Sequence, residues 1–344
     1  MRVLLTGDRG YIASVLVSEL IKKDYEFIGF DIGFFEENIL KKPFSDYQKI
    51  TKDIRDIEIS DLEGINAIIH LAGLSNDPLG EFSTKHTDEI NNLSTFKLAK
   101  LAKDSGVSRF IFASSQSMYG ISDTDEELDE DNSNKNPVTA YAKAKWDAEQ
   151  EIQQLATDDF IVTSFRPSTV FGASPRLRCD IVFNNLVACA YTTGKIEILS
   201  DGTPWRPVVH VKDVCSAFIS GLEAPANIIN KRSFNVGIPN GNFSVRDLAI
   251  AAQSSVPGSE LKFTGEHGSD SRTYKVSFER ILNDLKDYYK PEWDLLKGGK
   301  ELVTFFEEIK FTEDEFRGRA CIRLQQLNWL IDNNNIDKNF RVRD

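Results

Sequence analysis

Short apolar runs alternate with amphipathic segments through the first half of the chain. The apolar runs are typical of strands buried on both faces, and they cover residues 3–5, 27–30, 67–71, 109–113 and 160–165. The intervening segments have helical spacing, over 11–23, 88–104 and about 137–154. This alternation predicts an α/β fold with a Rossmann-type, doubly wound parallel sheet.

The regular alternation ends at about Gly172. Beyond it, segments punctuated by proline and glycine predict a smaller mixed α/β domain that closes over the carboxyl edge of the sheet. We therefore expect a sheet domain over 1–172 and a second domain over 173–344, with segments near 205–215 and 234–239 returning to the first. Residues 301–333 have a mainly helical pattern and form a C-terminal extension.

Glycines lie at the first turn from strand to helix, in Leu4-Leu-Thr-Gly7-Asp-Arg-Gly10-Tyr-Ile-Ala13. Without side chains there, the backbone can approach a pyrophosphate, and the helix N-terminus favours its charge. Asp31 ends the second apolar run, where an acid can bind the hydroxyls of the adenosine ribose and repel a 2′-phosphate. NAD is therefore favoured over NADP, although Arg9 in the turn is a signal for NADP.

Tyr141 and Lys145 lie four residues apart in a helical segment, so they share one face of the helix. A lysine ammonium beside a phenol stabilises the phenolate and lowers the pKa of the tyrosine. Such a tyrosine can exchange a proton with an alcohol or ketone near neutral pH. The spacing also occurs by chance on many helices.

These motifs, together with Asp53-Ile-Arg-Asp56, His70-Leu-Ala-Gly73, Asn91, Phe112-Ala-Ser-Ser115 and Arg166-Pro167, follow one order along the chain. The whole resembles the extended short-chain dehydrogenase/reductase family, in its nucleotide-sugar epimerase/dehydratase branch. The resemblance implies catalysis by Ser115, Tyr141 and Lys145. It implies cofactor contacts at Gly7, Arg9, Gly10, Tyr11, Ile12, Asp31, Asp53, Ile54, Leu71, Ala72, Gly73, Asn91, Ser114, Tyr141, Lys145, Arg166 and Pro167. His70 is expected to be a packed residue at a strand end.

The resemblance also implies a substrate. Arg206 and Arg272 match family segments whose arginines reach a nucleotide diphosphate, and guanidinium groups bind phosphate oxygens in a bidentate way. Arg176 and Arg178, in Pro175-Arg-Leu-Arg178, could add positive charge near the substrate. The full set of expected substrate contacts is Ser115, Gln116, Ser117, Thr169, Arg176, Arg206 and Arg272.

The two residues after Ser115 bear on the reaction. Dehydratases of this branch have an acid there, whereas this chain has Gln116 and Ser117, which cannot act as a base near neutral pH. An NAD-dependent epimerase, acting at C4 through a transient ketone, is therefore expected. A nucleotide-sugar dehydrogenase or 4-ketoreductase is the alternative. A non-catalytic NAD-binding protein and a dehydrogenase of apolar substrates fit the sequence less well.

Composition and charge indicate which partners, compartment and metals the protein is expected to have. With 41% hydrophobic residues, 27% charged residues and a net charge of −12, the chain is expected to be globular and to bind neither nucleic acid nor membranes. Four cysteines without paired spacing fit a cytoplasmic protein, and four scattered histidines predict no metal site.

Apolar residues on the helices around 91–103 and 141–154 (Leu93, Phe96, Trp146 and Ile152) suggest a homodimer, as in the family.

Overall fold

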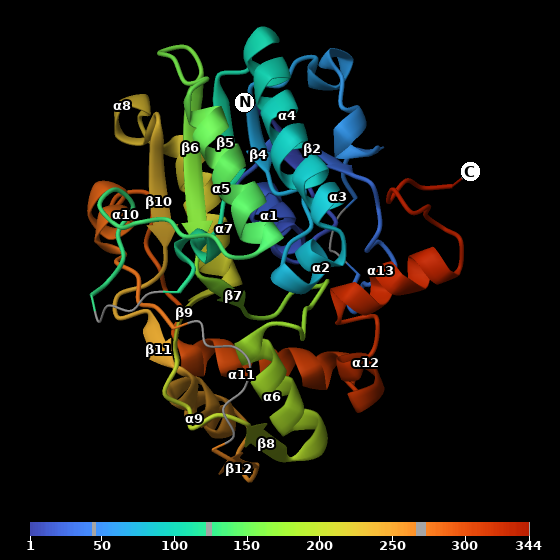
Figure 1. Cartoon of the computed structure of the whole chain (residues 1–344), viewed down its shortest axis with the longest axis vertical. Helices are drawn as coiled ribbons and strands as arrows, with labels where there is room; N and C mark the ends of the chain where they lie inside the picture. The colour runs from blue at the N-terminus through green and yellow to red at the C-terminus, as the bar shows by residue number, and fades with distance from the viewer. Residues whose placement is uncertain (43–45, 122–125, 266–272, 344) are drawn as a thin grey trace.

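A seven-stranded parallel sheet forms the centre of the molecule (Figure 1). The computed structural model describes residues 1–42, 46–121, 126–265 and 273–343. The order across the sheet is β10-β6-β5-β4-β1-β2-β3, and each neighbouring pair is parallel. The strands are β1 (Arg2–Thr6), β2 (Glu26–Asp31), β3 (Lys49–Thr51), β4 (Ala67–His70), β5 (Arg109–Ala113), β6 (Ile161–Pro167) and β10 (Arg232–Val236). The strand order reverses between β1 and β4, so the predicted doubly wound fold is confirmed.

Helices cover both faces of this sheet. One face carries α1 (Tyr11–Lys22) and α7 (Val211–Glu223), and the other carries α4 (Ser94–Asp104) and α5 (Ala140–Gln153). Alternate residues of β1 therefore enter different cores: Val3 and Leu5 pack with α1 and α7, whereas Leu4 packs with α4 and α5. This two-sided burial explains why the strands are continuous apolar runs.

The segment before α4 is less regular than the sequence pattern. It contains α2 (Asp77–Phe82), α3 (Thr84–Asp88) and a π-helical turn, η3 (Glu89–Leu93). The predicted helix over 88–104 thus begins earlier and contains a widened turn. Short 3₁₀ helices complete this part: η1 (Ile54–Asp56), η2 (Ile59–Leu62) and η4 (Gln116–Tyr119).

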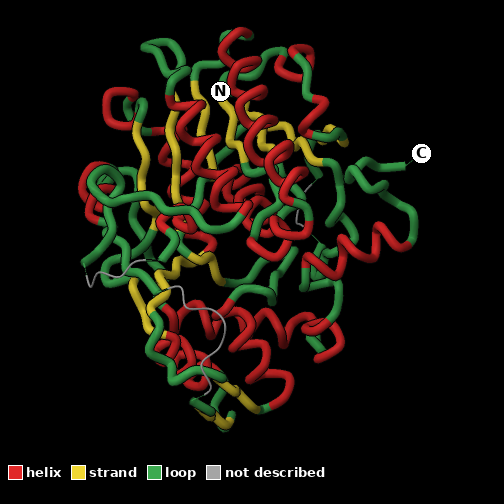
Figure 2. Tube along the Cα trace, viewed as in Figure 1, coloured by secondary structure: helices red, strands yellow, loops and turns green. Residues whose placement is uncertain are grey.

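A smaller part with mixed elements lies beyond the carboxyl ends of the sheet strands, and helices dominate it (Figure 2). Its strands are β7 (Thr169–Phe171), β9 (Trp205–His210) and β11 (Asn242–Ser244) in one sheet, and β8 (Lys195–Ile198) and β12 (Glu260–Phe263) in another. Its larger helices are α6 (Val182–Thr193), α9 (Val245–Ser255) and α11 (Leu295–Ile309). The short helices α8 (Ala226–Ile229) and α10 (Glu279–Asp284) lie beside β10.

The segments near 234–239 and 205–215, both expected to return to the sheet domain, take different positions. β10 joins the central sheet, next to β6. The 205–215 segment divides: β9 pairs with β7 and β11 in the separate sheet, and only from Val211 does the chain, as α7, pack on the central sheet.

The C-terminal extension crosses from the small part back to the sheet. After α12 (Glu313–Arg317), α13 (Arg323–Asp332) lies against the loop that follows β2. The Gln326 amide donates to the Phe34 carbonyl (3.1 Å), and the Asn38 amide donates to the Arg319 carbonyl. The extension therefore ties the two parts together. None of the described helices is long and apolar enough to cross a membrane.

Candidate active site

One cavity of about 700 Å³ lies at the carboxyl ends of the central strands, where the two parts meet. The glycine turn, the ends of β2, β4 and β5, and the start of α5 line one side. Residues 167–170, 178–182, 185 and 186 line the other. Ligands of doubly wound sheets bind at this edge, beside the point where the strand order reverses.

The glycine turn is shaped for a close ligand. Gly7 has φ +74°, and a Cβ there would lie 2.7 Å from the Ala72 nitrogen, so no larger residue fits. Gly10 precedes α1 without a side-chain cap, which leaves first-turn N–H groups available to an anion. The Tyr11 hydroxyl fixes the turn by donating to the Gly172 carbonyl (2.8 Å). Gly7, Gly10, Tyr11 and Ile12 all line the cavity, as a dinucleotide pyrophosphate would require.

Asp31 ends β2 and also lines the cavity. Its carboxylate accepts hydrogen bonds from the backbone N–H groups of Gly33 (2.7 Å) and Arg9 (3.3 Å), and burial raises its pKa. The Arg9 guanidinium instead donates to Glu36 (2.9 Å) and Thr51 (2.7 Å) and does not line the cavity. The acid is therefore available to a ribose, whereas the basic side chain that suggested NADP is engaged elsewhere.

Other expected cofactor residues have distinct positions. The carboxylate of Asp53 is held by Arg55 (2.6 Å) and Arg341 (3.0 Å). The side chain of Asn91 makes two hydrogen bonds to the backbone of Leu74 (2.8 and 2.9 Å), so it holds the loop after β4 and does not itself line the cavity. Those that do line it are Asp53, Ile54, Leu71, Ala72, Gly73, Ser114 and Pro167.

His70 is a packed residue, as expected. It is fully buried, and its ring nitrogens contact the hydroxyls of Thr6 (2.6 Å) and Thr95 (2.8 Å). Burial lowers the pKa of His70 to about 3, so the imidazole is neutral at physiological pH.

The three expected catalytic residues line the same cavity. The Thr139 hydroxyl caps α5, so Tyr141 lies in the first turn. The Lys145 ammonium, one turn later, is 4% exposed and donates to the Ala113 carbonyl (2.8 Å) at the end of β5. The Ser115 hydroxyl is 2.8 Å from that of Ser117 and forms a hydrogen bond that lowers the pKa of Tyr141.

The electrostatics of the pair differ from the sequence expectation. Burial raises the pKa of Tyr141 to about 12, with only partial opposition from the Ser115 hydrogen bond and the charge of Arg178. Burial also lowers the pKa of Lys145 to about 7. The protein alone therefore does not lower the tyrosine pKa, because burial of the phenol outweighs the groups that oppose it.

The residues after Ser115 are engaged with the protein. The Gln116 amide is 1% exposed, donates to the Arg166 carbonyl (2.9 Å) and accepts from the Ser168 hydroxyl (3.1 Å). Ser117 contacts Ser115, as described above. Both residues and Thr169 line the cavity, and neither Gln116 nor Ser117 adds a carboxylate to it.

Two arginines lie away from their expected places. The Arg176 guanidinium donates to the carbonyls of Phe35 and Glu36 and does not line the cavity, because its loop directs it toward the segment after β2. Arg166 forms a buried ion pair with Glu149 (2.5 Å), and it too lies outside the cavity lining. Both are therefore structural rather than ligand-facing in this arrangement.

Of the three other arginines expected near the substrate, two line the cavity and one lies outside the described residues. Arg206 lines the cavity, and its guanidinium donates to the Trp205 carbonyl (2.8 Å). Arg272 lies outside the described residues. Arg178, expected with Arg176 to add positive charge near the substrate, does line the cavity. It forms two hydrogen bonds to Asp180 (2.8 and 3.0 Å), and its charge opposes the rise in the pKa of Tyr141. The sequence pattern does not show which of Arg176 and Arg178 faces the cavity, since both lie in one irregular loop.

Comparisons with known proteins identify the family and the fold. Residues 3–237 match the model of the NAD dependent epimerase/dehydratase family. The chain is 28% identical over 332 residues to a dTDP-D-glucose 4,6-dehydratase of Mus musculus (92% of this chain and 88% of that protein). It is 29% identical over 307 residues to a UDP-glucose 4-epimerase of Bacillus subtilis (76% and 84%).

The fold is also that of a UDP-glucuronic acid 4-epimerase from Bacillus cereus, solved in complex with UDP-glucuronic acid and NAD. The TM-score is 0.76 with 21% identity, over 90% of this chain and 100% of that one. The family resemblance and the expected dependence on NAD are thus confirmed at the level of the family. The family model spans more than half of the chain, which therefore belongs to the NAD-dependent epimerase/dehydratase family.

Proposed function

We propose that this protein is an NAD-dependent nucleotide-sugar epimerase that acts at C4 through a transient keto-sugar. The observation that carries the proposal is the meeting of Ser115, Tyr141 and Lys145 with the glycine turn in one cavity, without an acid after Ser115. A dehydrogenase or 4-ketoreductase would use the same residues. Four free thiols support a reducing compartment, the cytoplasm.

Each catalytic side chain has a defined task. Tyr141 exchanges the proton of the reacting hydroxyl, and Ser115 donates a hydrogen bond to the same oxygen as the C–O bond order changes. Lys145, fixed on the Ala113 carbonyl, lies one turn further along α5 for the nicotinamide ribose. The bound nicotinamide supplies hydride exchange with the sugar carbon.

The residues around Tyr141 favour epimerisation over elimination. Elimination requires a base for a second carbon, and Gln116 and Ser117 are not acids. The nearby carboxylates are already engaged: Asp77 accepts from Thr139 (2.6 Å), and Asp180 is held by Arg178. The relatives include an epimerase and a dehydratase at similar identity, so the reaction is inferred from the residues.

The substrate class follows from the other half of the cavity. Arg206 and Thr169 line it opposite the glycine turn, and a guanidinium there suits the diphosphate of a nucleotide sugar. Arg178 is close enough to Tyr141 for its charge to act on the tyrosine pKa. We therefore assign it to the end of the cavity where the sugar would react. Arg272 remains part of the proposed diphosphate site.

We also propose a homodimer through the outer faces of α4 and α5. Leu93 is 53% exposed before α4, and Phe96 and Trp146 are partly exposed beside it. Ile152 belongs to the buried core instead and does not contribute to this face.

Product analysis tests the function. The purified protein is incubated with UDP-glucose, UDP-glucuronic acid or dTDP-glucose, and products are separated and weighed by mass spectrometry. An epimerase gives a product of unchanged mass without added coenzyme. Loss of water would identify a dehydratase, and stoichiometric use of NADH would identify a reductase; either result would overturn the epimerase proposal.

A further inference from the structure

Arg323 is the first residue of α13, outside the segment that the family model matches. It is only 2% exposed, yet it lines the active-site cavity. Its guanidinium lies over the ring of Phe35, 4.8 Å from the centroid. A buried arginine in a ligand cavity requires a partner, because an unpaired buried charge is costly.

The protein satisfies this side chain only in part. Nη2 donates to the Arg176 carbonyl (2.9 Å), whereas Nη1 is buried without a hydrogen-bond partner. Within the described ranges, no carboxylate lies within ion-pair distance of the guanidinium. Burial, followed by repulsion from Arg178, lowers the pKa of Arg323 to about 9, and the charge of Asp180 opposes this shift only in part. Nη1 can therefore donate to a ligand, and an anionic acceptor would also offset the buried positive charge.

The position of Arg323 indicates which anion. Phe35 follows Asp31 in the loop after β2, the ribose end of the cofactor site. Arg176 belongs to the loop that covers the glycine turn, where the Ser174 hydroxyl donates to the Tyr11 carbonyl (2.8 Å). The guanidinium thus lies between the ribose acid and the helix N-terminus that suits a pyrophosphate.

Three other cations of the cavity lining are already engaged. Lys52 is paired with Asp61 (2.8 Å), Arg178 with Asp180, and Lys145 donates to a carbonyl. The glycine turn offers only backbone N–H groups to two phosphate charges. A charged donor would complete the site.

We propose that Arg323 donates from Nη1 to a phosphate oxygen of the dinucleotide diphosphate, so that α13 is part of the cofactor site. The inference rests on the NAD binding in the proposed function. The diphosphate of the nucleotide sugar has the same chemistry, but the neighbouring Phe35 and Asp31 loop belongs to the cofactor end.

Calorimetry with Arg323→Gln tests this assignment. NAD should bind about 10- to 100-fold more weakly than to the wild type, which is the range expected for one lost charge-assisted hydrogen bond. Adenosine and UDP should bind with unchanged affinity, because neither probe places a diphosphate at this end. Arg323→Lys should recover part of the affinity. Arg317→Gln is the matched control, since this arginine of α12 is exposed and pairs with Glu313.

Several results would overturn the inference. Equal losses for NAD and adenosine, with a lower melting temperature, would show that Arg323 only supports the loop. A loss for UDP alone would assign it to the substrate. Unchanged NAD affinity in a folded variant would also reject it. If Arg323→Gln does not fold, Arg323→Lys is measured instead, and equal losses for NAD and adenosine in that variant would reject the inference. Failure of the wild type to bind NAD would refute the proposed function instead.

Discussion

Replacement of Arg166 by methionine should destabilise the protein without weakening NAD binding. The Arg166–Glu149 pair is almost fully buried, with side chains 3% and 2% exposed. The arginine donates to both oxygens of Glu149 and also to the Tyr119 hydroxyl (3.0 Å). In the variant, Glu149 would keep the hydrogen bond from Ser233 (2.6 Å) but lose its charged partner. Breaking a buried pair by removing one partner costs about 3–5 kcal/mol.

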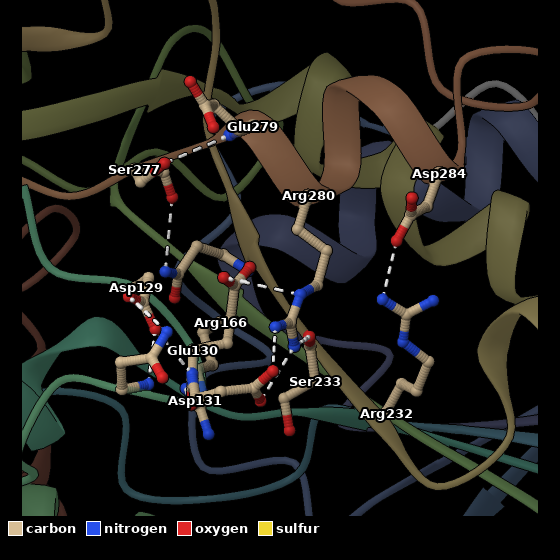
Figure 3. A network of polar contacts seen from close by, with 12 residues as sticks. Asp129, Glu130, Asp131, Arg166, Arg232, Ser233, Ser277, Glu279, Arg280 and Asp284 are labelled. Atoms are coloured by element: carbon tan, nitrogen blue, oxygen red, sulfur yellow. Dashed lines mark hydrogen bonds and ion pairs between the residues drawn. The ribbon is translucent and has the colours of Figure 1, made fainter.

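Figure 3 shows the surroundings of Arg166, including Arg232, which provides the control. Arg232 pairs with Asp284 (2.6 Å), and both side chains are about one-third exposed. Arg232→Met should therefore cost at most about 1 kcal/mol. The midpoints of urea unfolding compare the two variants, and calorimetry measures NAD affinity. Weaker NAD binding with unchanged stability in Arg166→Met would refute the structural assignment and restore the cofactor role expected from the sequence.

The pH dependence provides a second test of the pair. Arg166 holds the pKa of Glu149 below its ordinary value, although burial alone would raise it. A lowered carboxyl pKa stabilises the folded state above the unfolded pKa of about 4.3, and this contribution is lost as pH falls through the folded pKa. The deficit of Arg166→Met should thus be largest at neutral pH and shrink in acid, where the variant protonates Glu149. A deficit that grows in acid would contradict the assignment.

Three further variants test the site and the assembly. Tyr141→Phe should lower kcat by orders of magnitude and leave NAD binding intact, because only the proton-transfer group is removed; near-normal turnover would refute the mechanism. Gly7→Ala should abolish NAD retention during purification, since the new Cβ meets backbone at 2.7 Å, whereas Gly106→Ala, with similar φ and open space, should retain NAD. Leu93→Glu should shift light-scattering mass from dimer to monomer; a wild-type monomer would exclude the proposed interface.

The central sheet was predictable because each buried strand is a continuous apolar run in the sequence. β5 occupies the expected residues 109–113, since an apolar run covered on both faces has few alternative structures. The segment before α4 was less predictable. Its π-helical turn depends on tertiary contacts, such as those of Asn91 with Leu74, which the spacing of apolar residues does not encode.

The cofactor turn could be located from sequence because Gly7 and Asp31 lie at fixed places on consecutive strands. The residues on the substrate side of the cavity could not be located in this way. Arg176 and Arg178 are two residues apart in an irregular loop, and only the folded loop shows that Arg178 faces the cavity. The position of Arg323 in the cavity could not be predicted either, because no local motif connects α13 with the loop after β2.

The pKa values of Tyr141 and Lys145 link the chemistry to the cofactor. Burial favours the neutral form of each group, with pKa values of about 12 and about 7. A phenol with the higher value is a poor base at neutral pH. A positive charge beside the phenol would stabilise the phenolate, and oxidised nicotinamide carries one. The desolvation that weakens the tyrosine in the protein alone also strengthens this charge interaction. Proton transfer at Tyr141 should therefore become efficient only in the cofactor-bound protein.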